Sequence, residues 1–362
     1  MMENRRSFMK KSGLFLAAST MPFPGLLASQ QKKKLGVALV GLGYYSRDLL
    51  APALQLTEHC ELIGIVTGSP EKIPVWQEKY GIKDKNVYNY DNMHTIVNNK
   101  EIDVVYIVLP NALHKKYTII GAEAGKHVWC EKPMAITVQE CQEMIDACNK
   151  NKVQLTIGYR MQHEPVTQTV IEWAKKKPYG NIETLNAEAG FYNSASNPDH
   201  WKINTELGGG AMFDMGVYSL NAARYSTGLE PVSVSAIMEN SRPDVFTADE
   251  TTLFNLEFPN GIKANCKTSF AANLNTLKVD CENGWYRLKP FQSYTGVQGE
   301  TSDGKILKPF QGNQQAKQMD EDALAIKNKT APLVPGEEGM KDIRVVEAIF
   351  KSAEESGKRI TI

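Results

Sequence analysis

The chain has 362 residues, enough for two domains of ordinary size with a well-buried core. Hydrophobic residues make up 42% of it and charged residues 23%, which is ordinary for a folded protein in water. Basic and acidic residues cancel to a formal net charge of zero, so nothing in the charge favours a nucleic-acid partner and we expect none.

Residues 1–30 carry the pattern of a cleavable export signal. The paired arginines of Arg5-Arg6-Ser7-Phe8-Met9-Lys10 precede a short apolar segment, Gly13 to Ala18, and a weakly apolar run then continues to Ala28. This order is typical of a bacterial twin-arginine signal, which directs the export of proteins that have already folded. We therefore predict a periplasmic or otherwise exported protein; the competing interpretation is a basic tail before a buried helix. No later apolar run is long enough for a membrane span.

The next segment predicts a nucleotide-binding turn. The apolar run Leu35–Val40 is typical of a buried parallel strand, and Gly41-Leu42-Gly43-Tyr44-Tyr45-Ser46 separates it from a helical pattern. Gly41 allows a tight turn, and Gly43 lets the backbone approach a pyrophosphate. We assign Gly41, Gly43, Tyr44 and Tyr45 to cofactor binding, against the alternative of an ordinary glycine-rich turn.

The second predicted strand, Glu61–Val66, bears on the choice of cofactor. An NAD-specific fold usually has an acidic residue at the end of this strand, to bind the ribose 2′-hydroxyl. Here Thr67 stands at that position and Lys72 follows. A hydroxyl and a cation suit a 2′-phosphate, so NADP is favoured over NAD. The alternative is that Lys72 is simply a solvated helix lysine.

Two further strands end in candidate site residues. One, Ile102–Leu109, is followed by Pro110, Asn111 and His114, and the other, His127–Cys130, by Glu131-Lys132-Pro133. Pro133 disfavours the helical region for Lys132, which we therefore place extended at the carboxyl edge of the sheet. Ligands bind at that edge in open α/β sheets. Lys132 is thus a candidate for the chemistry itself.

Alternating strands and helices up to Ile157 predict a parallel, doubly wound sheet. After Tyr159-Arg160 the pattern changes to successive strands, which predict an antiparallel or mixed sheet, with helices over Val166–Lys176 and Lys341–Ser356. Pro259-Asn260-Gly261 predicts a hairpin turn between two of the strands. The strands expected are Ile182–Tyr192, Val232–Met238, Thr251–Phe258, Ile262–Phe270 and Leu277–Cys281.

In the second half, Gly208-Gly209-Gly210 precedes Ala211-Met212-Phe213-Asp214-Met215-Gly216-Val217-Tyr218. A helix that begins near Ala211 places Asp214 and Tyr218 one turn apart on the same face. A carboxylate and a phenol that point together, below glycines that allow close backbone approach, are candidate site residues. An aspartate favoured by the helix dipole and a core tyrosine explain the pattern about as well.

Six cysteines are scattered without the spacing of a metal site, so we expect no metal. Buried free thiols are the favoured interpretation, and a bridge between Cys266 and Cys281 is the alternative.

Together these motifs resemble the glucose–fructose oxidoreductase family, also called the Gfo/Idh/MocA family, over essentially the whole chain after the signal. The resemblance rests on the glycine turn, Pro110-Asn111 with His114, Glu131-Lys132-Pro133, and Asp214 to Tyr218. It looks closest to the exported glucose–fructose oxidoreductase branch.

The resemblance implies a Rossmann domain over residues 32–157 joined to an open-faced, mostly antiparallel sheet domain with helices over 158–362. Whether the C-terminal helix packs back on the first domain stays open. The resemblance further implies hydride transfer between a sugar or polyol carbon and nicotinamide C4, and assembly as a homo-oligomer, a dimer or a tetramer.

The same resemblance implies roles for single residues. Lys132 would contact the reacting hydroxyl, Asp214 would orient the substrate, and Tyr218 would be the acid/base. Further contacts to the sugar would come from Tyr159, Arg160 and Trp201. The implied cofactor contacts are Gly41, Gly43, Tyr44, Tyr45, Thr67, Lys72, Leu109, Pro110, Asn111, His114, Glu131, Lys132 and Arg160.

Several activities fit this resemblance. The leading one is an NADP-dependent sugar oxidoreductase, which either couples two sugars or acts as a simple dehydrogenase. Some exported relatives are NAD-dependent glycosidases, but those should have a carboxylate at the position of Thr67. A non-catalytic sugar or nucleotide sensor is the third possibility, and the presence of Lys132, Asp214 and Tyr218 together argues against it.

Overall fold

The computed structural model describes residues 34–195, 197 and 200–362 of the chain. The predicted signal peptide, residues 1–30, lies outside this range. Among the described residues, the helices are all too short or too polar to cross a lipid bilayer.

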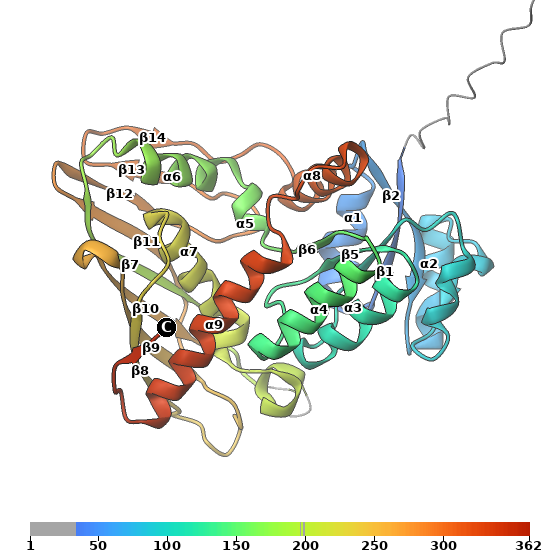
Figure 1. Ribbon diagram of the computed structural model, residues 1–362, viewed down its shortest axis with the longest axis horizontal. Coiled ribbons are helices and arrows are strands. Elements are labelled where there is room, and N and C mark those ends of the chain that lie inside the picture. Colours follow the sequence, from blue (N-terminus) through green and yellow to red (C-terminus); the bar gives the residue numbers. More distant parts are fainter. Residues whose placement is uncertain (1–33, 196, 198–199) are drawn as a thin grey trace, which may run out of the picture. The chain divides into compact units, whose positions relative to one another are not determined.

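A six-stranded parallel sheet forms the first half, in the order β3-β2-β1-β4-β5-β6 (Figure 1). This is the doubly wound arrangement that the alternating pattern predicted, and its strand order reverses between β1 and β4. The strands are β1 (Leu35–Val40), β2 (Cys60–Val66), β3 (Val87–Tyr88), β4 (Val104–Ile107), β5 (His127–Cys130) and β6 (Leu155–Ile157).

Helices cover both faces of this sheet, which explains why its central strands are apolar throughout. On β4, Val105 and Ile107 belong to the core cluster that includes α3 and α4, whereas Tyr106 belongs to the cluster beneath α1 and α8. The helices are α1 (Ala51–Leu54), α2 (Ile73–Tyr80), α3 (His114–Glu123), α4 (Val138–Lys150), α5 (Arg160–His163), α6 (Pro165–Lys176), α7 (Val217–Thr227), α8 (Gln314–Asn328) and α9 (Gly336–Glu354).

The second sheet is mixed and mostly antiparallel, as predicted, with the order β14-β13-β12-β11-β7-β10-β9-β8-β15. Only β7 and β10 pair in parallel among its strands. Pro259-Asn260-Gly261 makes the expected turn between β9 and β10. The strands are β7 (Ile182–Gly190), β8 (Ser233–Glu239), β9 (Thr251–Glu257), β10 (Lys263–Ser269), β11 (Leu274–Cys281), β12 (Gly284–Leu288), β13 (Gly299–Thr301), β14 (Ile306–Leu307) and β15 (Ile360–Thr361).

One face of this second sheet is covered and the other is open. Helix α7 contacts β7, β10 and β11, and α9 contacts β8. Leu185, Ala187 and Ala189 of β7 are buried on the covered side, whereas Thr184 and Asn186, which alternate with them, are not. This alternation of buried and unburied residues is expected for a sheet with one solvated face.

Helix α8 was not predicted. Its buried face mixes apolar and polar residues, which weakens its apolar periodicity. Ala316, Met319 and Ala323 belong to a core cluster, and Gln314, Gln315, Gln318 and Asp322 are buried beside them. It nevertheless packs on α1 and β2 of the first sheet, although it comes from the second half of the chain. The prediction of residues 158–362 as one separate region therefore misses this return.

Helix α9 begins at Gly336, five residues before the Lys341 start expected from its apolar pattern. Glu337 and Glu338 in its first turn favour an earlier start through the helix dipole. The helix contacts α4 and β6 of the first sheet as well as β8 of the second (Figure 1). It thus packs against elements of both sheets.

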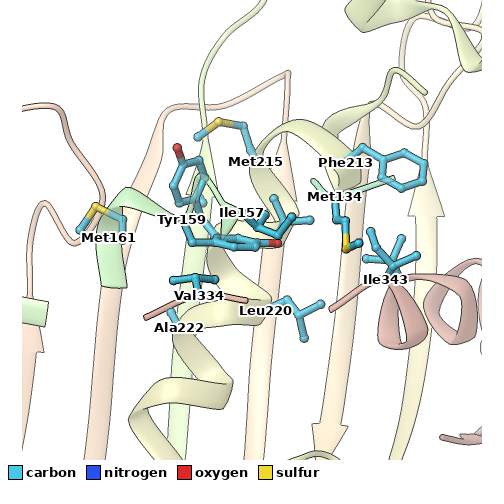
Figure 2. Packing of buried hydrophobic residues seen from close by; sticks show 14 of the residues in the cluster. Met134, Ile157, Tyr159, Met161, Phe213, Met215, Leu220, Ala222, Val334 and Ile343 are labelled. Atoms are coloured by element: carbon cyan, nitrogen blue, oxygen red, sulfur yellow. The ribbon is translucent and has the colours of Figure 1, made fainter. Parts of the chain in front are cut away.

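Figure 2 shows the core where α7, α9 and the end of β6 meet, with Ile157, Tyr159, Leu220, Val334 and Ile343 packed together. A buried ion pair lies in the same region. Arg224 of α7 contacts Asp342 of α9, and its guanidinium also reaches Glu230 and Glu338. All six cysteines are buried and free, so the Cys266–Cys281 bridge does not form.

Candidate active site

Lys132 follows β5 and reaches a helical segment of the second half. Its ammonium donates to the backbone carbonyl of Asp214 at 2.6 Å and lies 3.7 Å from a carboxylate oxygen of the same residue. Asp214 lies in a π-helical turn, Met212–Gly216, that leads into α7. Lys132 and Asp214, which the sequence singled out separately, therefore meet, and both side chains are about nine-tenths buried.

Sequence reasoning missed a second lysine at Asp214. Lys202, in the short helical turn Trp201–Ile203, donates to the other carboxylate oxygen at 2.8 Å. Burial alone would raise the pKa of Asp214, but Lys202 and Lys132 outweigh it and hold that pKa below its ordinary value. Asp214 is therefore a fixed carboxylate between two ammonium groups. A basic residue beside Trp201 was the only available signal in the sequence.

The glycine triplet places Lys202. The amides of Gly209 and Gly210 donate to the carbonyls of Asn204 and Lys202, at 2.9 and 2.8 Å. A Cβ on Gly209 would lie 2.5 Å from the carbonyl oxygen of Trp201. The close backbone approach expected here is thus made by the chain's own loop.

Two cations flank the ring of Tyr218. The Lys132 ammonium lies 4.5 Å from the ring centroid, and the centre of the Arg160 guanidinium lies 5.5 Å from it. Such cations stabilise negative charge that develops on the phenol oxygen when its proton moves. Lys132, Asp214 and Tyr218 are therefore brought together in one site.

Arg160 connects this site to two residues that the sequence did not single out. Its guanidinium is buried, lies 4.7 Å from the ring of Tyr294 and donates to the side-chain oxygen of Gln314 on α8. The Tyr294 ring in turn lies 6.0 Å from that of Tyr45 in the glycine turn. The glycine turn and the catalytic candidates thus lie within one chain of contacts.

The glycine turn has the geometry that a dinucleotide needs. Gly41 has a φ of +95°, and a Cβ there would lie 2.3 Å from the carbonyl oxygen of Val108. A Cβ on Gly43 would meet no atom within 4 Å, so room remains at this position. Tyr44, next along, has 59% of its surface exposed. These observations fit a turn that leaves its outer side to a pyrophosphate.

The residues assigned to cofactor choice lie beside this turn. Thr67 is buried at the end of β2, and its hydroxyl accepts from the amide of Ser69 at 3.1 Å. The Lys72 ammonium donates to the carbonyl of Leu42, within the glycine turn, at 3.3 Å. A hydroxyl and a cation thus lie beside the glycine turn, with no carboxylate in either position.

Several predicted cofactor residues support the backbone of the site. The ring nitrogens of buried His114 lie 2.9 Å from the carbonyls of Leu109 and Pro133, so the imidazole packs between the loops after β4 and β5, and its neutral form donates to one of the two carbonyls. Burial lowers the pKa of His114, which favours the neutral ring. Asn111 donates to the carbonyl of Gly208 at 2.6 Å and ties the first half to the glycine triplet. Pro110, which lies between Leu109 and Asn111 in the sequence, is half-buried.

Two predicted sugar contacts have different outcomes. Tyr159 is 1% exposed and packs in the core with Ile157 and Val334 (Figure 2), so the prediction that it contacts a sugar is wrong. Tyr159 lies two residues after the apolar strand β6, and its side chain points into the same core as Ile157. Trp201 is half-buried and stacks with His200, next to Lys202, which leaves its predicted role open.

Glu131 is a buried carboxyl beside these groups. The hydroxyl of Tyr106 donates to it at 2.6 Å. Burial raises its pKa to about 7, despite the opposing effects of Tyr106, Lys132 and Arg160. Across residues 34–195, 197 and 200–362, no group of three or more His, Cys, Asp or Glu side chains is arranged to hold a metal ion.

We expect Glu131→Gln to change how stability depends on pH in the cofactor-free protein. The carboxyl has an ordinary pKa of 4.5 and a folded pKa of about 7, so the folded state binds more protons in this window. The unfolding free energy of the wild type should therefore fall, relative to the variant, by up to about 3 kcal/mol as pH rises from 4.5 to 7. Urea unfolding at a series of pH values measures this difference. The exposed control Glu71→Gln should show no such trend.

Comparisons with known proteins agree with this architecture. Residues 35–159 match the model of an oxidoreductase family with an NAD-binding Rossmann fold, and residues 167–287 match the GFO/IDH/MocA C-terminal domain. An aldose–aldose oxidoreductase from Caulobacter crescentus, solved with glycerol, is 38% identical, with a TM-score of 0.87 over 91% of this chain and 100% of that one.

Two curated relatives are less similar in sequence and also match most of both chains. An NADP-dependent D-xylose 1-dehydrogenase from Haloarcula marismortui is 28% identical and covers 88% of this chain and 90% of its own length. A D-glucoside 3-dehydrogenase from Escherichia coli is 26% identical over 91% of this chain and 97% of its own length.

Proposed function

Because the chain belongs to the GFO/IDH/MocA oxidoreductase family, we propose that it is an exported, NADP-dependent enzyme that oxidises or reduces a sugar at a CH–OH carbon. The observation that carries the proposal is the convergence of Lys132, Asp214 and Tyr218 in a site whose contacts reach the glycine turn. The names of the relatives, a xylose dehydrogenase and an aldose–aldose oxidoreductase among them, favour an aldose.

The residues present divide the chemistry between them. When bound, the nicotinamide accepts or returns the hydride. Lys132 donates to the sugar oxygen and stabilises the negative charge that develops there. Tyr218 takes the hydroxyl proton during oxidation and returns it during reduction. Asp214 contacts both lysines. Its carboxylate accepts a hydrogen bond from a neighbouring sugar hydroxyl, and this contact fixes the orientation of the reacting carbon.

The preference for NADP rests on Thr67 and Lys72. We expect Lys72→Glu to weaken NADP binding about 10- to 100-fold, because a charge-assisted contact to phosphate contributes about 1.5–3 kcal/mol. NAD binding should change little, since NAD lacks that phosphate. Fluorescence titration of the purified protein with both reduced cofactors measures the ratio.

Lys79→Glu provides the matched control, because Lys79 lies on the same helix α2 and is exposed. An equal loss for NADP and NAD in Lys72→Glu, or no loss for either, would show that Lys72 does not select the phosphate.

Turnover with D-glucose and D-xylose distinguishes a simple dehydrogenase from an enzyme that couples two sugars. Nicotinamide absorbance is recorded at the start and at the end of the reaction, and only a simple dehydrogenase leaves the cofactor reduced.

Export and assembly are further parts of the proposal. The twin-arginine pattern around Arg5-Arg6 supports export, and fractionation of cells that express the full chain tests it. A homo-oligomer, a dimer or a tetramer, follows from the family resemblance. Light scattering on the purified protein tests the assembly.

A further inference from the structure

A row of buried polar groups leads away from the site along helix α8. Tyr106, whose hydroxyl binds Glu131 at 2.6 Å, lies 3.4 Å from the amide nitrogen of Gln318. One helical turn further along α8 is Asp322, 1% exposed. The Asp322 carboxyl lies 4.0 Å from Nε2 of His163, whose Nδ1 lies 2.6 Å from the carboxylate of Glu321.

Several atoms in this row have no protein partner. Within the described part of the chain, no group offers normal hydrogen-bond geometry to Oε1 of Gln318, to either oxygen of Asp322 or to Nε2 of His163. Buried polar atoms are almost always satisfied by protein or by ordered water. Four such atoms from two helices, α5 and α8, therefore indicate water between them. Water at Gln318 also bypasses its amide, which does not pass protons readily.

The far end of the row opens at a surface pocket. The pocket has a volume of about 540 Å³, and His163, Lys317 and Glu321 contribute to its wall. The side chain of Glu321 is 40% exposed, so it exchanges protons with solvent. The row thus extends from Glu131, next to Lys132, to a solvated carboxylate on another face of α8.

We propose that Asp322 and His163, with water held between them, form a relay that carries the reaction proton between the active site and the pocket at Glu321. The proposal rests on the proposed oxidoreductase function. Oxidation of a sugar hydroxyl breaks its C–H and O–H bonds, and two electrons leave with the hydride for the nicotinamide. The remaining proton passes from Tyr218 to Glu131, both of which have Arg160 as a neighbour, then to Asp322, His163 and bulk solvent. Reduction runs the same path in reverse.

The charges around Asp322 suit this role. It is faced by His163 of α5, by Gln318 and Glu321 of α8, by Tyr106 of β4 and by Cys60 of β2. Burial raises the pKa of Asp322 to about 7, against the lowering effect of His163.

The pKa of Glu131 is also raised by burial to about 7, like that of Asp322 at the other end of the buried row. Glu131 is faced by Tyr106, Lys132, Arg160, Tyr45 and Cys130. Burial thus raises the pKa of both carboxyls, so each can take up and release a proton near neutral pH.

Infrared titration of the cofactor-free protein tests the relay without any turnover. We expect two protonated carboxyl bands that disappear as pH rises through about 7, one lost in Asp322→Asn and the other in Glu131→Gln. Asp320→Asn is the control, because Asp320 lies on α8 but accepts from the amides of Glu58 and His59. If neither carboxyl titrates in this range, the relay is excluded whatever the enzyme catalyses.

Proton release tests the path in the complete enzyme. Stopped flow with NADP, D-xylose and a pH indicator should show release slowed about tenfold in Asp322→Asn and His163→Gln, with a larger solvent isotope effect. The Asp320→Asn control should match the wild type. Because His163 lines the pocket, imidazole added to His163→Ala should restore the rate.

The outcomes separate the two proposals. Unchanged proton release in both variants, or a loss that imidazole does not restore, would overturn the relay while leaving the oxidoreductase function intact. If the wild type binds NADP but releases no proton with any aldose, the function fails, and the infrared result still decides whether the buried carboxyls share a proton.

Discussion

Replacing Lys132 with methionine should lower kcat for sugar oxidation by about 10²- to 10³-fold, the loss typical of removing one donor to a developing oxyanion. Methionine keeps the length and apolar stem of lysine, so packing against the site is largely retained. The ammonium that reaches Asp214 and the ring of Tyr218 is lost. Steady-state turnover with D-xylose and NADP gives kcat, and fluorescence titration gives the cofactor affinity.

Cofactor affinity should change much less than kcat, because Lys132 acts mainly on the sugar oxygen. Lys176→Met is the control, since Lys176 lies at the end of α6 and pairs only with exposed Glu172 among the contacts described. If Lys132→Met and Tyr218→Phe both retain the wild-type rate, the catalytic assignment is wrong.

Replacing Arg224 with methionine should reduce the unfolding free energy by about 3–5 kcal/mol, because it leaves Asp342 buried without its cation. Asp342 is 0% exposed. Besides Arg224, the side-chain amide of Asn221 donates to its carboxylate at 3.0 Å. Activity would also fall, because a smaller fraction of the protein is folded at any time. Urea unfolding, followed by circular dichroism, measures the loss.

The double variant Arg224→Met, Asp342→Leu is the decisive comparison. Removing both buried charges should restore most of the stability that the single variant loses, because the desolvation cost of Asp342 disappears. A double variant as unstable as the single one would show that packing around Arg224, and not the unpaired carboxylate, determines the loss.

Local pattern was enough to predict five of the six strands of the first sheet, because apolar runs mark them. The two-residue strand β3 was not predicted. Lys132 could be placed for the same reason, since Pro133 fixes the backbone where β5 ends. The strands that follow one another in the second half likewise predicted an antiparallel or mixed second sheet. These features depend on residues close together in the chain.

What could not be predicted depends on long-range contacts. Helix α8 buries glutamines and an aspartate among its apolar residues, so the apolar stripe on its inner face is weak. Lys202 enters the site only because the glycine triplet folds beneath its loop. Tyr159 was predicted to contact a sugar because an aromatic ring can stack on a pyranose. Its side chain lies in the core, however, whereas that of Arg160 reaches Tyr218.

The shortest contact of Lys132 at Asp214 is with the backbone carbonyl, at 2.6 Å, and the carboxylate lies more than 1 Å further away. A carbonyl is present whatever side chain occupies the position. Mutation at residue 214 can therefore change how a substrate is oriented while the lysine keeps its principal acceptor. Two kinds of atom of one residue thus divide the work, the backbone carbonyl holding the catalytic lysine and the carboxylate facing the substrate.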